Sequence, residues 1–570
     1  MAVLRDLAGP PLPVLARAGA TARTRQLALG GVGLAILALA LYFHSYRLGA
    51  TPGWDPQEGY NLDLAWNLAH GRLRLFALTS AFAQHPPLFY LQLVLAIRVF
   101  GYGIVAVRAL AAIYAVLTCA ALMAVGRRLL GAGPALWAAL AFTVAPIMLA
   151  NTRWGYTYAQ LAFVGVLCLW ATWCYSCAPR DFSGWESWRW LLAAAALAGL
   201  AALSDYEGIA WVLVVALVAL RRNWRDAALA AGIGLALPVA GLLACLAAAP
   251  AVFLADFSTT LGRAGGGNPV LQGVMLLVNY YRLATVDVWL TLGMVGLFLV
   301  PARVRGFVFG VVAVLALVVL KARDIGLSIH TAVPLLPLLA LGVGMALHTA
   351  LRRLYVWSIG WLAPVWLTAQ LRLRALPIRS VQHAGGAPPS PAEPLNERTA
   401  PRAVRLAAAT IVFLVVVSPV GLSLASDAAG LSSTLPTRQD ELLATPNNAD
   451  ATARYVLTHA RAGDLVLASP EIAWMFDQPA APAPATLGAD LLQTLAERGE
   501  AASFYPAGLP ASRWAYDTSL ARARYVVVDN LIRRLAQPDQ VGSLKPVLAE
   551  AQRWPAVYTS GQYTVYERPA

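Results

Sequence analysis

Long runs of apolar residues recur along this 570-residue chain, and they constrain its fold more than any other feature. A helix needs about 20 predominantly apolar residues to cross the roughly 30 Å hydrocarbon core of a bilayer. Only 13% of the residues are charged, whereas soluble domains carry about 25%. Membrane barrels would instead show segments of about ten residues with alternating polarity. The sequence therefore predicts a polytopic α-helical membrane protein.

We expect about eleven spans, the first of them after a basic N-terminal segment, residues 1–26. The Trp-rich segment 354–370 contains Pro364 and is flanked by arginines, which favours a helix in the membrane interface. If it crossed the membrane, the C-terminus would lie on the other side. The expected spans are 27–43, 104–126, 134–150, 157–176, 188–203, 208–220, 227–248, 286–301, 306–320, 331–351 and 406–424.

The net charge of +14 comes largely from arginines in short connections between the apolar runs, such as Arg127 and Arg128. Connections of this kind are typical of cytoplasmic loops, and they argue against nucleic-acid binding. Connections that carry acidic residues, such as Asp55 and Asp205, alternate with them. We therefore expect a plasma (inner) membrane protein with a cytoplasmic N-terminus and a first external loop at residues 46–103.

Composition changes near the C-terminal end of the chain. Residues 27–426 form the expected membrane domain, which includes a Pro/Gly-rich cytoplasmic linker at 371–405. Residues 427–570 have the composition of a soluble domain, and we expect an α/β fold outside the cytoplasm. Short β-branched and aromatic runs predict its strands, at 464–468, 525–529, 557–559 and 563–566.

Two carboxylates, Asp55 and Glu58, stand out in the first external loop. Near a membrane surface they could bind a cation or take a proton from an incoming hydroxyl group. The same residues also fit a helix start, with Asp55 as the N-cap, Pro56 at the first position and Glu58 closing a capping box. On these residues alone we favour the helix start. Likewise, His85 and the two prolines after it could form only a rigid turn.

The order of motifs in this region resembles one enzyme superfamily. An acidic pair is followed by Gly59 and Tyr60, then by a helix end at 67–71, then by His85-Pro-Pro-Leu-x-Tyr, and then by the segment 100–108. This order resembles the first external loop of GT-C membrane glycosyltransferases of the protein O-mannosyltransferase and aminoarabinose-transferase type, including the RgtA/B/C/D-like branch. A weaker similarity covers residues 328–342.

The resemblance implies an enzyme that moves a sugar from a polyprenyl-phosphate donor to an extracytoplasmic acceptor, with inversion. The acceptor would be a lipid, a polysaccharide or a protein. It implies no definite cofactor beyond the lipid-linked sugar, and it leaves open whether a divalent cation is needed. The sequence assigns no metal ligands.

The resemblance also assigns roles to residues. It places catalysis at Asp55 and Glu58, although Gln57 stands where the family carries the Asp of an adjacent Asp-Glu pair. A phosphate leaving group is stabilised by cations, although a basic residue at a membrane edge is ordinarily an interfacial anchor. The candidates for binding the donor phosphate or substrate are His85, Arg153, Lys321, Arg323 and His330.

Two other functions stay open. A transporter or flippase would ordinarily carry ionisable residues near the centres of its spans, and the predicted spans lack them. A non-catalytic membrane protein of cell-envelope polysaccharide assembly is favoured by the departures from the family pattern at Gln57 and Gln84.

Overall fold

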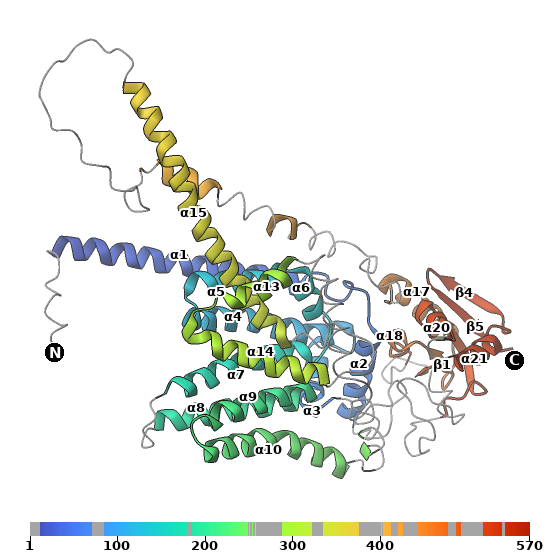
Figure 1. Cartoon of the computed structure of the whole chain (residues 1–570). Helices are drawn as coiled ribbons and strands as arrows, with labels where there is room; N and C mark the ends of the chain where they lie inside the picture. Colours follow the sequence, from blue (N-terminus) through green and yellow to red (C-terminus); the bar gives the residue numbers. More distant parts are fainter. Residues whose placement is uncertain are drawn as a thin grey trace, which may run out of the picture.

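A computed structural model of the chain defines the fold. It describes residues 12–70, 85–178, 185–248, 288–321, 334–374, 403–411, 420–423, 443–476, 486–491, 517–538 and 542–569, together with 250, 253, 254, 257, 401 and 425. Two parts follow each other along the chain: a bundle of apolar helices and a C-terminal domain at one end of that bundle (Figure 1).

Apolar helices make up the bundle. Within the described residues, five helices are long and apolar enough to cross a membrane, which confirms the predicted helical membrane class, while the total number of spans stays a prediction. The bundle helices are α1 (Leu12–Ser45), α4 (Ile104–Leu129), α5 (Ala132–Val144), α6 (Pro146–Arg153), α7 (Tyr158–Cys177), α8 (Trp185–Ser204), α9 (Ile209–Leu220), α10 (Trp224–Ala248), α13 (Val288–Phe298), α14 (Ala302–Lys321) and α15 (Leu336–Arg374).

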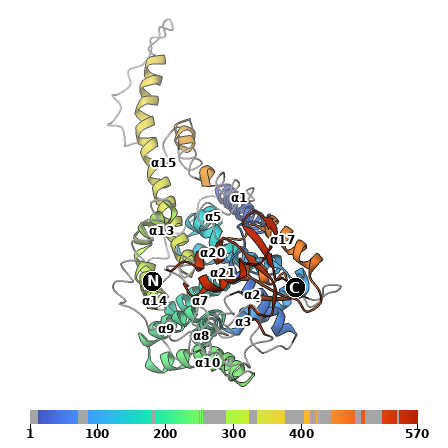
Figure 2. The same cartoon turned by 90° about the vertical axis from the view of Figure 1, so that its right-hand side faces the viewer.

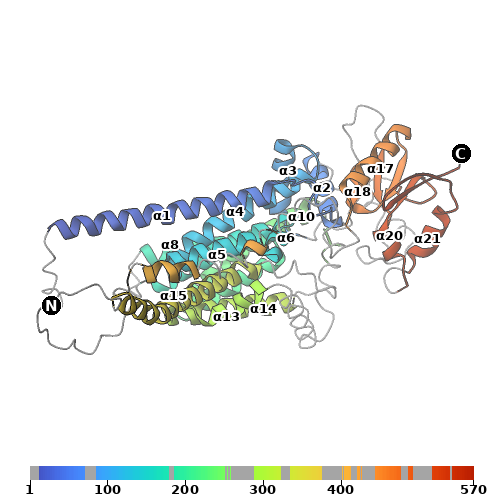
Figure 3. The ribbon, with the colours of Figure 1, turned by 90° about the horizontal axis from the view of Figure 1, so that it is seen from above.

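Two expected spans have different bounds in the structure. The single span predicted at 134–150 was wrong, because the chain forms α5 and α6 with a break at Ala145, just before Pro146. The residue before a proline is forced out of the helical region. The separation of 331–351 from an interfacial helix at 354–370 was also wrong, since α15 continues through Pro364 to Arg374. Figure 3 shows α15 and α1 extending away from the C-terminal domain.

Small residues let the bundle helices approach closely. A Cβ atom added at Gly296 in α13 would lie 1.8 Å from the carbonyl oxygen of Gly342 in α15. Membrane helices associate largely through packing, and glycine allows backbone contact that larger residues prevent. Gly296 and Gly342 therefore fix how α13 lies against α15.

The C-terminal domain is a five-stranded sheet between helices. The strand order is β2-β1-β3-β5-β4, with β2, β1 and β3 parallel and β5 antiparallel to both β3 and β4. All four strands predicted from the sequence are present. The elements are α17 (Pro446–His459), β1 (Leu465–Ala468), α18 (Pro470–Ala473), β2 (Leu487–Asp490), β3 (Ala523–Val528), α20 (Asn530–Leu535), α21 (Leu544–Ala551), β4 (Ala556–Ser560) and β5 (Tyr563–Glu567).

Alternating side chains of β3 build two cores. Tyr525 and Val527 pack with α17 and α18, whereas Val526 and Val528 pack with α20 and α21. Because successive side chains of a strand point to opposite faces, the helices cover both sides of the sheet. The first of these cores continues without interruption into the segment of the membrane domain that follows α1.

The domain is attached to that segment, which contains α2 (Pro56–Ala69) and α3 (Pro87–Phe100). Trp54 and Ala444 exchange two backbone hydrogen bonds of 3.0 Å. The Tyr60 hydroxyl donates to Oδ2 of Asp490 at 2.7 Å. Figure 2 looks onto this end of the molecule and shows the domain in front of the bundle.

Candidate active site

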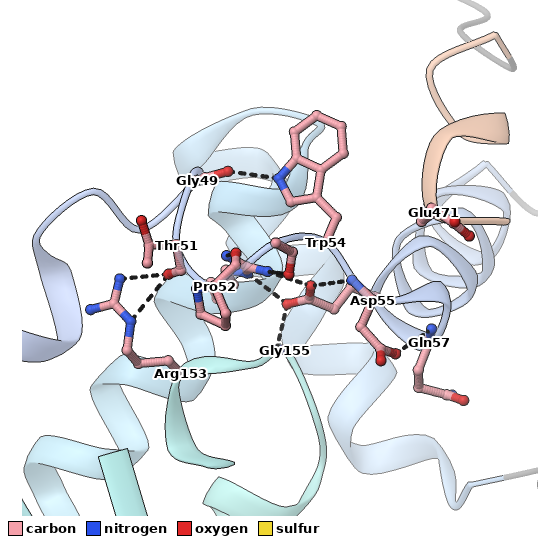
Figure 4. Close-up of polar contacts among 12 residues, drawn as sticks. Gly49, Thr51, Pro52, Trp54, Asp55, Gln57, Arg153, Gly155 and Glu471 are labelled. Carbon is pink, nitrogen blue, oxygen red and sulfur yellow. Dashed lines mark hydrogen bonds and ion pairs between the residues drawn. The ribbon is translucent and has the colours of Figure 1, made fainter. Parts of the chain in front are cut away.

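The start of α2 forms the predicted capping box. The backbone N–H of Gln57 donates to Oδ1 of Asp55 at 2.8 Å, and the N–H of Asp55 donates to Oε2 of Glu58 at 3.1 Å (Figure 4). These contacts satisfy N–H groups that a helix start otherwise leaves without partners. The expectation of a helix start is confirmed, and it places both carboxylates at the same turn.

Glu58 is the buried anion of this turn. Its carboxylate accepts two hydrogen bonds from Arg108, from Nε at 2.7 Å and from a terminal nitrogen at 2.6 Å. The N–H groups of Gly155, at 2.8 Å, and of Asp55 supply two more. Both side chains of the ion pair are fully buried. A carboxylate with four donors is well suited to hold structure and poorly placed to receive another proton.

Arg108 extends this network to the loop before α2. Its guanidinium also donates to the carbonyl oxygens of Leu48, Pro52 and Gly53, at 3.1, 2.7 and 2.9 Å. The planar fork of an arginine suits several fixed acceptors at once. The segment 100–108, which resembles a family motif, thus ends in a residue that fixes the shape of the loop before α2.

The short connection between α6 and α7 lies between two groups of polar side chains, one around Asp55 and the other around Asp205. The carbonyl oxygen of Gly155 accepts a bond of 2.9 Å from the Asn61 side chain. Tyr156 is hydrogen-bonded to Asp55, and burial, followed by the charges of Asp55 and Glu58, raises its pKa well above the usual value. The Tyr156 phenol therefore stays protonated beside Asp55.

The next residue of this connection reaches a second acidic group. The Thr157 hydroxyl donates to Oδ2 of Asp205 at 2.7 Å, and the same oxygen lies 2.9 Å from Nδ1 of His85. The N–H of Glu207 donates to Oδ1 at 3.0 Å. Burial by itself would raise the pKa of Asp205, but the bonds from His85, Glu207 and Thr157 outweigh it and lower the pKa. Asp205 is consequently an anion that holds His85.

Glu207 differs from its neighbour. It lies in the short 3₁₀ helix Tyr206–Gly208 and is buried, and its Oε2 has no hydrogen-bond partner. Burial, and then the charge of Asp205, raises the pKa of Glu207 well above its usual range. A carboxyl group in such surroundings favours the protonated form.

Arg153, a predicted donor-binding residue, is held by backbone carbonyl groups. Its guanidinium donates to the backbone carbonyl oxygens of Phe43, Tyr46 and Thr51 and is 2% exposed. It therefore binds the carbonyl groups at the end of α1 and the loop that follows. These carbonyl groups hold the guanidinium in the structure, and its assignment to the donor phosphate stays a prediction.

The remaining cationic candidates cannot be placed. Arg323, His330 and the side chain of Lys321 lie outside the described residues, so their assignment to the donor phosphate stays a prediction. Within the residues that the structure describes, no group of three or more His, Cys, Asp or Glu side chains could hold a metal ion.

Sequence reasoning missed Asp205, Tyr156 and Thr157. In the sequence, the segment 205–207 is either a cation ligand or a polar helix end, and its position at the end of an apolar run favours the helix end. The signal in the sequence was a pair of carboxylates between two apolar runs. They are predicted to lie on the same side of the membrane as Asp55. Tyr156 and Thr157 gave no signal, because their roles depend on contacts with residues far away in the sequence.

The chain is similar to known proteins in part of its sequence and in its fold. The dolichyl-phosphate-mannose-protein mannosyltransferase family model matches residues 84–253. No curated protein sequence matches the chain. The match covers α3 to α10 and includes His85, Arg108 and Asp205.

Solved structures share the fold along almost the whole chain. ArnT from Cupriavidus metallidurans bound to undecaprenyl phosphate has a TM-score of 0.54 at 18% identity, covering 94% of this chain and 97% of that one. The same enzyme in the apo state gives 0.54 at 17% identity, covering 96% and 98%. The archaeal oligosaccharyltransferase AglB from Archaeoglobus fulgidus, in complex with an inhibitory peptide and a dolichol-phosphate, gives 0.51 at 14%, covering 89% and 70%.

The chain therefore has the fold of membrane glycosyltransferases. The family match over residues 84–253 and this fold agree with the GT-C resemblance of the sequence motifs. Its apolar helices and the membrane enzymes of the same fold give it a membrane location.

Proposed function

We propose that the protein transfers a sugar, with inversion, from a polyprenyl-phosphate donor to an acceptor outside the cytoplasm, and that Asp55 is the base. The observation that carries the proposal is the contrast within one helical turn. Glu58 is fully buried and saturated by donors, whereas Asp55 is half-buried at the same turn. Asp55 is thus the carboxylate of the pair that an acceptor can approach.

The donor class is supported by the relatives in fold. ArnT was solved with undecaprenyl phosphate and AglB with a dolichol-phosphate. The proposed orientation keeps the N-terminus in the cytoplasm of a cell with a plasma (inner) membrane. The first external segment and the C-terminal domain then lie outside, where a lipid, polysaccharide or protein acceptor would be met.

The chemistry needs two groups on opposite sides of the sugar. The acceptor hydroxyl forms a new bond to C1 while the bond from C1 to the phosphate oxygen breaks, and the polyprenyl phosphate leaves with the electron pair. Asp55 takes the hydroxyl proton, a role that contributes roughly 10²–10⁴-fold in rate. Cations near the phosphate stabilise the charge that develops on it, which is the role proposed for His85, Lys321, Arg323 and His330.

Substitution of Asp55 by Asn tests the base. Asn is as good an N-cap as Asp, so D55N keeps the start of α2 and removes the basic group. We expect transfer from a labelled undecaprenyl-phosphate sugar by the purified protein to fall about 10²–10⁴-fold, with an unchanged melting temperature. D55A, which also loses the cap, serves as the comparison for stability. Full activity of D55N would remove Asp55 as the base.

The same assay defines the substrates. A panel of polyprenyl-phosphate pentoses and hexoses identifies the sugar, and lipid, polysaccharide and peptide fractions identify the acceptor. Chelation with EDTA before the assay tests whether a divalent cation is needed. Wild-type protein that transfers none of these sugars would contradict the proposed activity.

A further inference from the structure

We propose that Asp205 is a positioning residue that holds the His85 ring so that its Nε2 atom meets the phosphate of the donor. This inference rests on the proposed function, because it assumes that a polyprenyl phosphate binds beside His85. It assigns a role to a residue that the sequence presented as no more than a polar helix end.

The bond between the two residues fixes which ring nitrogen is available. Nδ1 of His85 lies 2.9 Å from Oδ2 of Asp205. A carboxylate accepts only, so Nδ1 carries the hydrogen and Nε2 is left for another partner. Of the two side chains, that of His85 is 14% exposed and that of Asp205 is 5% exposed. A ligand can therefore reach the ring but hardly the carboxylate behind it.

Asp205 is itself held in place by two further bonds. The Thr157 hydroxyl, at 2.7 Å, shares Oδ2 with His85, and the N–H of Glu207, at 3.0 Å, binds Oδ1. Pro86 and Pro87 directly follow His85 and restrict the backbone there. Both ends of the pair are consequently rigid, which is what a residue needs if it is to orient another.

The pair is also connected to the proposed base. Thr157, which binds Asp205, follows Tyr156, which is hydrogen-bonded to Asp55. The reaction requires a base and a phosphate-binding group at one sugar, and a single short connection between α6 and α7 orients both. An ion pair that only stabilised the fold would not need to be connected to the proposed base.

A double-mutant cycle on the full-length protein in detergent tests the inference. The probe is undecaprenyl phosphate, and its dissociation constant is measured for wild type, D205N, H85Q and D205N/H85Q. We expect each single substitution to weaken binding about tenfold, because a charge-assisted bond is roughly twice as strong as a neutral one. The double variant should bind no more weakly than H85Q alone, since Asp205 acts through His85.

D226N is the matched control. Asp226 accepts a bond of 2.7 Å from the Tyr175 hydroxyl, near the C-terminal end of α7, whereas Thr157 precedes the N-terminal end of that helix. Its loss should leave binding of undecaprenyl phosphate at the wild-type value. H85K, which restores a cation without the ring, should recover part of the binding and should be insensitive to D205N.

Two results would overturn the inference: wild-type affinity in D205N, or losses in the two single variants that add up in the double variant. Wild-type protein that fails to bind undecaprenyl phosphate would also reject it. The failure of the proposed function is distinguishable, because protein that binds the lipid with the expected cycle yet transfers no sugar would refute the transfer alone.

Discussion

The segment after α1 and the C-terminal domain each begin a helix with a buried glutamate, and the two helix starts face each other. Glu58 lies in the first turn of α2 and Glu471 in the first turn of α18, and each helix has proline at its first position. Gly59, next to Glu58, packs directly against the carbonyl group of Pro470. The two local sequences are similar, but the charged side chain beside Glu58 is a cation and the one beside Glu471 is an acid.

A cation makes the difference. Glu58 receives the Arg108 guanidinium from α4 and two backbone N–H groups. Glu471 is equally buried, and the neighbouring charge that acts on it most strongly is that of Asp529. Burial, and then Asp529, raises the pKa of Glu471 well above its usual range. One glutamate is a structural anion, and the other favours the neutral form.

The largest expected effect comes from removing the charge of Glu58. In E58Q the buried Arg108 guanidinium loses its counter-ion, which costs about 3–5 kcal/mol. The melting temperature of the purified protein should fall sharply. The double variant E58Q/R108Q should be less destabilised than the sum of the two single variants. An unchanged melting temperature in E58Q would show that the pair contributes nothing.

The next effect concerns the contact between the two helix starts. A Cβ atom at Gly59 would lie 2.0 Å from the carbonyl oxygen of Pro470, so G59A must separate α2 from α18. Overpacking of this kind costs about 1–3 kcal/mol, and limited proteolysis should cleave between the membrane domain and the C-terminal domain more readily. The matched control is G232A in α10, where nothing lies within 4 Å of the added atom. Equal effects of both variants would reject the close approach.

Glu471 should make stability depend on pH. Its pKa is raised in the folded protein, so the folded state binds more protons than the unfolded state between the unfolded value of about 4.5 and the raised value. Stability is then fully present below about pH 4.5 and falls as pH rises through the raised pKa. E471Q has no carboxyl group to titrate, so its stability should not fall in this way as pH rises.

The measurement is the melting temperature of wild type and E471Q from pH 4 to pH 8. The two should agree near pH 4, and E471Q should be the more stable at pH 8. The control is E567Q, because Glu567 pairs with Arg524 at the surface of the same domain, where ion pairs contribute about 0–1 kcal/mol. Parallel curves for wild type and E471Q would refute the prediction.

For Y60F we expect an effect of about the same size as that of G59A. The variant leaves Oδ2 of the buried Asp490 without its bond of 2.7 Å from the Tyr60 hydroxyl, which costs about 1–3 kcal/mol. Y102F is the matched control, since the Tyr102 hydroxyl reaches the Trp474 carbonyl only at 3.5 Å. A loss of stability as large in Y102F as in Y60F would show that the difference in geometry has no consequence.

Local patterns predicted much of the fold. The apolar runs, the four strands and the capping box at Asp55 depend on neighbours in the sequence, and the structure has all of them. The errors at Pro146 and in α15 show the limit of such patterns. One proline ended a helix, whereas Pro364 did not, because neighbouring groups decide whether a broken backbone bond is tolerated.

By itself the sequence determined the membrane class, four of the five strands of the C-terminal domain and the turn that carries Asp55 and Glu58, whereas β2 gave no signal. Only the tertiary structure decided which acidic residues are charged and what they hold. Arg108 and the N–H of Gly155 donate to Glu58, His85 and Thr157 are the partners of Asp205, and the charged neighbour of Glu471 is another carboxyl group, that of Asp529. The physical reason is that a buried carboxylate depends on donors within hydrogen-bonding distance, and these come from segments that only folding brings together.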